Sequence, residues 1–247
     1  RTTCIILSAL LVICAALVGG QILLPISSGV GQSTYYVDQT SGSDSNTGRS
    51  EAQAWKTIAK VNGLTFSAGS RILFKSGETW REKLTVPSDG VTFGSYGAGV
   101  HPLIVGSDVK TTSGFTLTTA QTNTYEGAQA TNPWWVWEDT IPLRQRSSIA
   151  AVESNAGSWW WDDAVDKLYI HAYDGSNVAS NGSVYEVAAR TENIDTNGKD
   201  NIIIDGIDCT RTGGDDNTLG GILITGSDTT IRNLSSYGHR RHAVSFY

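Results

Sequence analysis

Methionine is missing from the whole sequence, position 1 included. We therefore expect that the chain does not begin at its natural start. Charged residues are also scarce, at 17%, and the formal net charge is −6 without any cluster of Lys and Arg that would offset it. This balance argues against nucleic acid as a partner and fits poorly with unaided capture of a polyanion.

Cysteine is nearly absent, with three residues in 247. Cys4 and Cys14 lie in an apolar N-terminal run, and Cys209 stands alone near the other end. An odd number with this distribution implies no disulfide framework. Cys209 is most simply predicted to be a small inward-facing core residue.

Only the N-terminus carries a long apolar run. No charged residue separates Arg1 from Asp38, and the residues from Cys4 to Gly20 are apolar or small. The run is longer than the usual apolar region of a cleaved signal peptide and near the lower limit for a membrane span. We predict that residues 1–33 are a signal peptide or membrane anchor plus a linker. The protein is then exported, secreted or on the cell surface, and it touches a membrane only through this segment, if the segment is not cleaved.

Glycine and short β-branched runs are abundant instead. Gly, Asn, Asp and Ser separate the runs, which predicts strands and turns. The runs also repeat: Ile204-Asp205-Gly206-Ile207 returns as Ile231-Arg232-Asn233-Leu234, and Gly221-Ile222-x-Ile224 returns as Ala243-Val244-x-Phe246. A period just above twenty residues is typical of a solenoid, in which each coil buries its inward-pointing residues against a neighbour.

The repeat makes a prediction about register. Ile222 should lie beside Val244 and Ile224 beside Phe246, in parallel strands, with all four side chains pointing inward. Leu223 and Ser245 should point outward. A β-sandwich with accidental spacing is the alternative, and it would pair these segments in an antiparallel hairpin.

The N-terminal part carries a family resemblance. The segments Tyr35-Tyr36-Val37-Asp38, 42–48, 54–62 and 69–80 resemble the cap and first coil of secreted bacterial right-handed parallel β-helix proteins of the pectate-lyase-like superfamily. Ser70 departs from the family, which usually has Asp there, and this should weaken a turn. The residues themselves predict a short capping helix, because Ser50 and Gln53 form a capping box and Gly63 is a suitable C′ residue.

The resemblance implies a division of the chain. Residues 34–108 are expected to form the cap and first coil, 109–190 an inserted Trp-rich antiparallel β segment, and 191–247 further coils truncated at the C-terminus. The insertion is predicted to contain strands at 134–137, 159–161 and 167–173. An all-β right-handed parallel β-helix is the fold class that follows.

Six of the eight tryptophans lie in the insertion. Most of them should form its hydrophobic core, because burial of an indole is strongly stabilising. Indole faces also stack on sugar rings. By strand alternation, Trp135 and Trp160 are the candidates for contact with a substrate.

A hydrolase interpretation follows from the resemblance. The polygalacturonase group uses the motifs N-x-D, G-D-D and G-H-G, and this chain has Asn193-Ile194-Asp195, Gly214-Asp215-Asp216 and Gly238-His239 in that order. Asp215, Asp216 and His239 are therefore candidate catalytic residues. Arg240 replaces the second glycine of the last motif, and Asp-rich corner turns are ordinary in any β-helix, which is the alternative.

A lyase interpretation stays open as well. It needs an Arg or Lys base and a cation that neutralises a uronate carboxylate. Arg232, Arg240 and Arg241 could serve as the base, with Ca²⁺ as a possible cofactor held by carboxylates such as Asp205, Asp208, Asp215 and Asp216. Arg240 and Arg241 are also candidates to bind an acidic sugar, although a solvated charged corner is the default.

Together these observations predict an exported carbohydrate-active β-helix protein. It would be a polysaccharide lyase or glycoside hydrolase acting on a polysaccharide, uronate-containing or neutral. The alternative is a non-catalytic cell-surface module for carbohydrate binding or adhesion. We expect a monomer, with polysaccharide as the partner.

Overall fold

The computed structural model describes residues 32–213 and 220–247 in full and the backbone of 17–18 and 21–22. Strands dominate this part of the chain. Its helices are short: α1 (Ile58–Asn62), α2 (Ile149–Glu153), and the 3-10 helices η1 (Glu51–Gln53) and η2 (Thr112–Gly114). None of the described helices has the length and apolar character that crossing a membrane requires. The predicted all-β class is confirmed.

Most of the predicted signal segment lies outside the described residues. Its described parts are β1 (Leu17–Val18) and β2 (Gln21–Ile22), which pair antiparallel with each other. Nothing in them tests whether the segment directs export.

Three sheets contain only parallel pairings. The first has the order β22-β19-β7-β4-β3, from β3 (Thr34–Val37), β4 (Arg71–Lys75), β7 (Thr92–Tyr96), β19 (Ile203–Asp205) and β22 (Thr230–Arg232). The second has the order β23-β20-β8-β5, from β5 (Thr79–Trp80), β8 (Leu103–Val105), β20 (Asp208–Thr210) and β23 (Ser236–Tyr237). The third has the order β24-β21-β18-β6, from β6 (Leu84–Thr85), β18 (Ile194–Asp195), β21 (Gly220–Ile224) and β24 (His242–Phe246).

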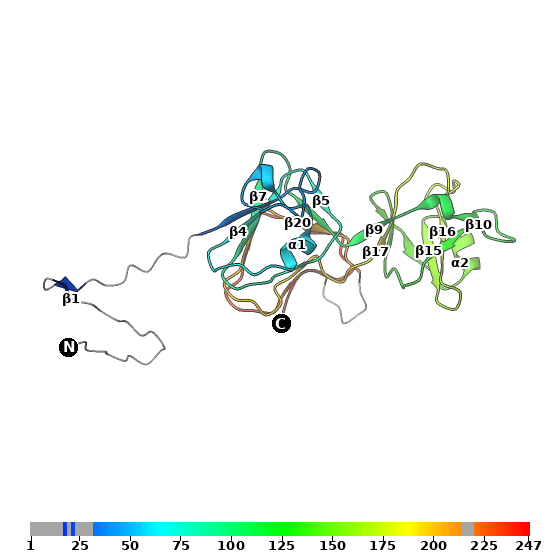
Figure 1. Ribbon diagram of the computed structural model, residues 1–247. Coiled ribbons are helices and arrows are strands. Elements are labelled where there is room, and N and C mark those ends of the chain that lie inside the picture. Colours follow the sequence, from blue (N-terminus) through cyan, green and yellow to red (C-terminus); the bar gives the residue numbers. More distant parts are fainter. Residues whose placement is uncertain (1–16, 19–20, 23–31, 214–219) are drawn as a thin grey trace.

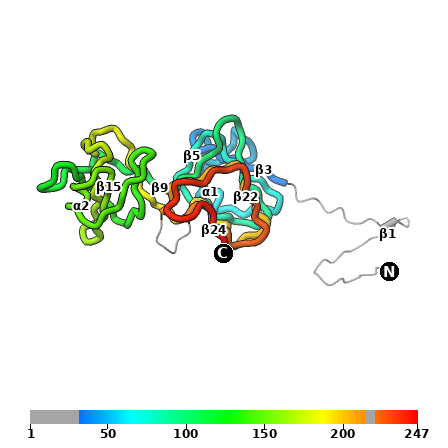
Figure 2. Tube along the Cα trace, turned by 180° about the vertical axis from the view of Figure 1, so that it is seen from behind, coloured from blue at the N-terminus to red at the C-terminus, as the bar shows by residue number. Residues whose placement is uncertain are grey.

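The chain visits these three sheets in a fixed rotation. β4, β5 and β6 lie in the first, second and third sheet, and β7 and β8 begin the next round. After the antiparallel segment, β18 resumes in the third sheet, where Ile194 pairs with Leu84 on one side and Ile222 on the other. Strands β19 to β24 complete two more rounds. β22, β23 and β24 end at the outer edge of their sheets, seen in red in Figure 2.

One hydrophobic core fills the space between the parallel sheets. Most of the short strands contribute an inward side chain, and these include Ile72, Phe93, Ile104, Ile204, Cys209 and Ile222. Cys209 is fully buried, as predicted. Burying an aliphatic or aromatic side chain of this size stabilises by about 1.5–3 kcal/mol.

The predicted register of the last strands is confirmed. β21 and β24 pair in parallel, with Ile222 beside Val244 and Ile224 beside Phe246. Ile222 and Ile224 are buried while Leu223 is partly exposed, as expected. Two side chains differ from the prediction: Phe246 is 74% exposed and Ser245 is buried. Phe246 is open because β24 is an edge strand, with no strand among the described residues on its far side.

The predicted capping helix is split in two. The backbone at Trp55, in the middle of the predicted helix, is extended instead. The Trp55 carbonyl accepts a 2.8 Å hydrogen bond from Asp38 N, and Trp55 forms a parallel bridge with Val37. Only η1 and α1 remain helical. Ser50 makes no side-chain cap, whereas Thr57 Oγ1 accepts from Lys60 N at 3.0 Å and begins α1.

The segment between β8 and β18 builds two further sheets (Figure 1, green). One has the order β13-β12-β17-β9, from β9 (Ser107–Lys110), β12 (Val136–Glu138), β13 (Ile141–Pro142) and β17 (Tyr185–Ala188), all antiparallel. The other has the order β10-β11-β16-β15-β14, from β10 (Thr116–Leu117), β11 (Tyr125–Ala128), β14 (Arg144–Gln145), β15 (Ser158–Asp162) and β16 (Lys167–His171). Only the pairing of β14 with β15 is parallel in it.

These sheets enclose a second hydrophobic core, which includes Trp159, Leu168, Ile170 and Tyr185. Two of the six tryptophans of this segment, Trp137 and Trp159, are buried, fewer than predicted. The strand predicted at 134–137 begins only at Val136, because Asn132 Oδ1 accepts from Trp134 N in a turn and Trp134 has a φ of 54°. Trp134 and Trp135 are therefore left in a loop at the boundary between the two cores.

Candidate functional site

A cavity of about 430 Å³ lies where the parallel sheets meet the antiparallel ones. The second parallel sheet contributes Leu103, Val105 and Thr210 to its lining, and the antiparallel side contributes Trp135, Trp137 and Glu186. This volume falls within the range of about 300–1,000 Å³ that is usual for small-molecule sites. We refer to it below as the first cavity.

Two tryptophans form one wall of the first cavity. The rings of Trp135 and Trp137 are stacked, with centroids 5.5 Å apart and planes at 19°. Alternation explains this, since side chains two residues apart emerge on the same face of an extended chain. Val136 points the other way, into the second core. The guanidinium of Arg211 lies 5.6 Å from the centroid of the Trp137 ring, within cation–π range.

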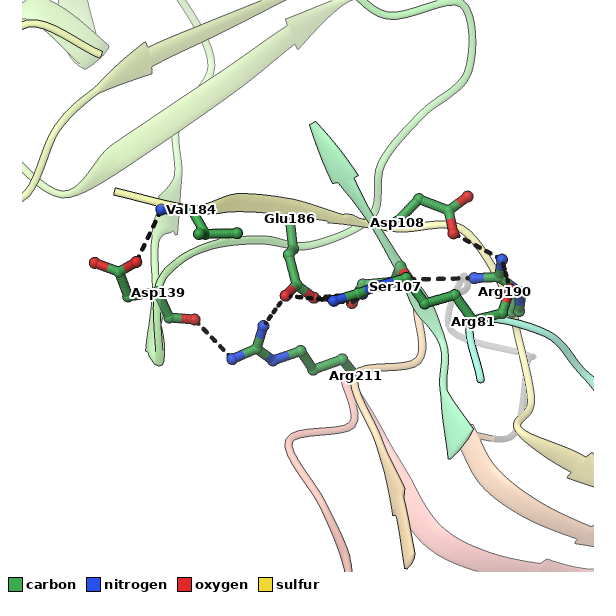
Figure 3. Close-up of polar contacts among 8 residues, drawn as sticks. All are labelled: Arg81, Ser107, Asp108, Asp139, Val184, Glu186, Arg190 and Arg211. Atoms are coloured by element: carbon green, nitrogen blue, oxygen red, sulfur yellow. Dashed lines mark hydrogen bonds and ion pairs between the residues drawn. The ribbon is translucent and has the colours of Figure 1, made fainter. Parts of the chain in front are cut away.

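Glu186 lines the first cavity and is the centre of its polar contacts. It lies on β17 as the cross-strand partner of Trp137. Its carboxylate accepts two 2.9 Å hydrogen bonds from Arg81 and forms a 2.7 Å ion pair with Arg211 Nη1 (Figure 3). Ser107 Oγ donates to the same carboxylate. Two sheets therefore meet at one buried carboxylate: Arg81 and Arg211 follow strands of the second parallel sheet, while Ser107 lies on β9, which pairs with the strand of Glu186.

These contacts keep the Glu186 carboxylate ionised. Burial raises the pKa of its carboxyl, but the hydrogen bonds from Arg81, Ser107 and Arg211 more than offset burial and lower the pKa to about 2. A general acid needs a pKa near the working pH, so Glu186 cannot serve as one. Of the described residues that line the first cavity, Glu186 is the sole carboxylate.

The arginines around Glu186 are engaged with the protein itself. Arg211 Nη2 donates to the Asp139 carbonyl at 2.6 Å, and Asp139 Oδ1 accepts from Val184 N at 2.8 Å. Arg190 pairs with Asp108 at 2.7 Å (Figure 3). The guanidiniums near the cavity are thus each held by acceptors of the protein, although Arg81 and Arg211 share the single carboxylate of Glu186.

Three bulky or charged residues near the cavity have left-handed backbone conformations. The φ angles of Trp134, Asp139 and Arg211 are 54°, 52° and 59°. Positive φ is unfavourable for bulky residues such as Trp134 and Arg211, whereas Asp adopts it more readily, and such strain is found at functional sites. Trp134 and Arg211 are therefore two strained positions at this junction.

A second cavity of about 270 Å³ adjoins the first. It is lined by Trp134, Trp135, Leu143, Gln145, Trp159 and Arg240. Trp135 lines both cavities. The Arg240 guanidinium lies 5.4 Å from the centroid of the Trp134 ring.

The structure separates the predicted substrate-binding residues. Trp135 lines both cavities and Arg240 lines the second. Trp160 stacks instead on its cross-strand partner Tyr169, with centroids 5.4 Å apart, away from both cavities. Arg241 is exposed and lines neither cavity.

Of the three predicted catalytic residues, His239 lies in the described part of the chain. Asp215 and Asp216 lie outside the described residues. His239 is half-buried, with Nδ1 2.8 Å from Thr212 Oγ1 and Nε2 2.9 Å from Ser236 Oγ. Burial lowers the pKa of His239 to about 4, so the ring is neutral at pH 7. It lines neither cavity, and a catalytic role for it stays a prediction.

The described residues contain no group of three His, Cys, Asp or Glu side chains that could hold a metal ion. Asp205 is bound by Arg232 and Asn233, and Asp208 Oδ1 lies 3.2 Å from His101 Nδ1. Arg232, one of the predicted lyase bases, is engaged in this pair. The Ca²⁺ suggestion for Asp215 and Asp216 falls outside the described residues.

Sequence analysis missed Arg81, Glu186 and Arg211. Nothing in their spacing links them, since Arg81 and Glu186 are 105 residues apart. One signal was present: Glu186 interrupts the apolar run Tyr185-Glu186-Val187-Ala188, whose four residues are all buried. A carboxylate within a buried strand requires charged partners.

Comparison with known proteins gives limited matches. No protein-family model matches the chain. A curated lacto-N-biosidase from Bifidobacterium longum subsp. longum is 23% identical, in a match that covers 63% of this chain and 13% of that protein. The chain thus spans a small part of that relative.

Two solved structures share the fold. The structure of XylC in complex with xylose matches with a TM-score of 0.60 and 15% identity, over 80% of this chain and 40% of that one. A structure described as a glycoside hydrolase matches with a TM-score of 0.52 and 9% identity, over 73% of this chain and 51% of that one. This chain spans about half of each structure or less.

Proposed function

We propose that this chain carries the glycan-binding cleft of a carbohydrate-active protein of the glycoside hydrolase type. The observation that carries the proposal is the stacked pair Trp135 and Trp137 on the wall of a 430 Å³ cavity. Pyranose rings present apolar C–H faces, and a rigid indole at a half-open cavity packs against such a face. The names of the lacto-N-biosidase and of the glycoside hydrolase structure support the same class.

The pairing of the arginines at the cleft favours a neutral glycan. Arg81 and Arg211 could in principle bind a uronate, but both guanidiniums are already paired with Glu186. Displacing one of them would leave the buried Glu186 carboxylate with an incomplete set of partners, which is unfavourable. A uronate substrate, and with it the lyase interpretation, is the weaker alternative.

Hydrolysis of a glycoside usually needs two carboxyl groups, one of them with a raised pKa. The described part of the cleft supplies Glu186, whose pKa is lowered. We propose that the described residues bind and orient the glycan, and that any hydrolysis uses carboxylates other than these. A non-catalytic binding module is the second candidate, favoured by the same observation.

We propose further that the three parallel sheets are the faces of a right-handed parallel β-helix, with residues 109–190 inserted between coils. Two features support this. The chain visits the sheets in a fixed rotation, and Ile194 pairs with Leu84 as if the insertion were absent. A solenoid accepts such an insertion because each coil needs only its neighbours.

We also propose that the protein is exported and acts outside the cytoplasm or on the cell surface. This rests on the apolar run that begins at Cys4. A glycan substrate of polymer size would be met there. Fusion of residues 1–33 to a reporter enzyme that is active only after export tests this proposal, and a reporter that stays inactive would contradict it.

Isothermal titration of the chain with xylotriose, lacto-N-biose and trigalacturonate tests the binding proposal. We expect at least one of the two neutral sugars to bind more tightly than trigalacturonate. Trp135→Ala should weaken that binding about tenfold or more, which corresponds to about 1.4 kcal/mol. Trp160→Ala is the matched control and should bind normally, because Trp160 lies away from the cleft. Preference for trigalacturonate, or no binding of either neutral sugar, would contradict the proposal.

A further inference from the structure

The two cavities adjoin each other at Trp135. The segments 134–145 and 237–240 each contribute residues to both: Pro142 and Gly238 line the first cavity, while Leu143 and Arg240 line the second. Trp135 lies between them and lines each. A ligand that occupied both cavities would therefore contact Trp135 along its length.

The size of the second cavity fits part of a ligand better than a whole one. Its 270 Å³ is just below the usual range for small-molecule sites, about 300–1,000 Å³, whereas the first cavity falls inside that range. A small cavity next to a larger one is the arrangement expected for adjacent sugar units of one chain.

Trp134 is placed at the second cavity against its own backbone preference. A φ of 54° is a genuine outlier for a bulky residue, yet the protein holds it there. Asn132 Oδ1 accepts from Trp134 N at 2.9 Å, and Gly213 leaves room, since a Cβ there would come within 3.1 Å of Trp134 Cβ. Asparagine or glycine would relax this position.

The left-handed conformation places the indole of Trp134 at the second cavity. Trp134 stays 36% exposed at the cavity, facing a floor that contains the buried ring of Trp159. Gln145, on the same wall, is exposed and carries an amide that can both donate to and accept from hydroxyl groups. Aromatic faces together with a neutral amide suit a neutral sugar.

We propose that the second cavity is a further sugar subsite, so that one neutral oligosaccharide of at least two units lies across Trp135 with its outer unit against Trp134. This inference rests on the proposed function of the first cavity. The inference adds a minimum length of two sugar units for the ligand. It also assigns to Trp134 the contact with the outer unit.

Titration with sugars of different length tests this subsite. The probes are xylose against xylotriose, and galactose against lacto-N-biose. For the series that binds, the longer sugar should bind at least tenfold more tightly than the single unit in the wild-type chain. Trp134→Gly should remove most of that advantage while leaving affinity for the single unit unchanged. Its melting temperature shows whether the variant stays folded, since relief of the left-handed backbone opposes the loss of the buried part of the indole.

Controls separate the possible failures. Trp134→Asn, which also tolerates the conformation, replaces the glycine variant if that variant does not fold, and Trp160→Ala should behave as wild type. Equal affinity for single and longer units in the wild type, or a length advantage that survives loss of Trp134, would overturn the subsite and leave the first cavity intact. No binding of any of the four sugars would overturn the proposed function and this inference together.

Discussion

Glu186 Oε1 and Arg211 Nη1 lie 2.7 Å apart, and their ion pair joins two sheets of different construction. Glu186 belongs to an antiparallel sheet, while Arg211 directly follows β20 of a parallel one. The same guanidinium lies over the Trp137 ring. The pair thus holds the aromatic wall of the cleft at a fixed position against the parallel sheets.

Replacing Glu186 with Gln should destabilise the protein. The change removes the charge from a buried acceptor and leaves Arg81 and Arg211, whose side chains are 32% and 17% exposed, without their counterion. Hydrogen bonds to a charged group contribute about 1.5–3 kcal/mol, so we expect a loss of that order in the free energy of unfolding at pH 7, measured by urea denaturation.

Glu126→Gln is the matched control for this change. Glu126 pairs with Lys167, whose side chain is 42% exposed, so its loss should change stability by about 0–1 kcal/mol. Equal losses in the two variants would show that the pairing of Glu186 contributes no more than an ordinary surface ion pair.

The effect of Glu186→Gln should also depend on pH. The pKa of Glu186 is about 2 in the folded protein against an ordinary value of 4.5, so its stabilisation is complete above pH 4.5 and is lost as the pH falls toward 2. Urea unfolding of both proteins between pH 7 and 2 should show their difference shrinking across this window. A difference that stays constant down to pH 2 would contradict the account.

His239 should remain neutral well below its usual range. Burial lowers its pKa to about 4 from an ordinary value of 6.5, so the stabilisation from this neutral ring is complete above pH 6.5 and is lost as the pH falls through 4. NMR of the His239 ring should show no titration between pH 8 and 5.5. In His239→Gln this part of the stability profile should disappear. A titration midpoint of His239 near pH 6.5 would show that burial does not lower the pKa of its ring.

The inward face of the third parallel sheet offers a packing test. Ile224→Ala should lower the free energy of unfolding by about 2–5 kcal/mol, because Ile224 is 4% exposed within the main core. Leu223→Ser should have a far smaller effect, since Leu223 is partly exposed. Chemical denaturation compares the two directly. A larger loss for Leu223→Ser would mean that the strand faces the other way.

Local pattern was enough to predict some of this structure. The repeat that places Ile222 beside Val244 could be found because alternation and spacing in a short-period coil are local properties of the sequence. The exposure of Phe246 could not be predicted from the alternation of the strand, because it depends on whether a neighbouring strand covers this side chain.

The site was less accessible to prediction. Trp135 was identified from alternation, but Trp134 was assigned to a strand although Asn132 and Pro133 indicate a turn just before it. The contact between Arg81 and Glu186 depends on how an insertion docks on the parallel sheets, which no local pattern encodes. The contact between these two side chains can be seen only in the folded structure.

A crystal structure of the chain soaked with xylotriose or lacto-N-biose tests the central claim most directly. The account predicts a pyranose ring packed on the exposed face of Trp135 in the first cavity, with Trp137 stacked behind it and the Glu186–Arg211 pair intact. A sugar bound at Trp160 instead, or an empty cleft at saturating concentrations of both sugars, would contradict it.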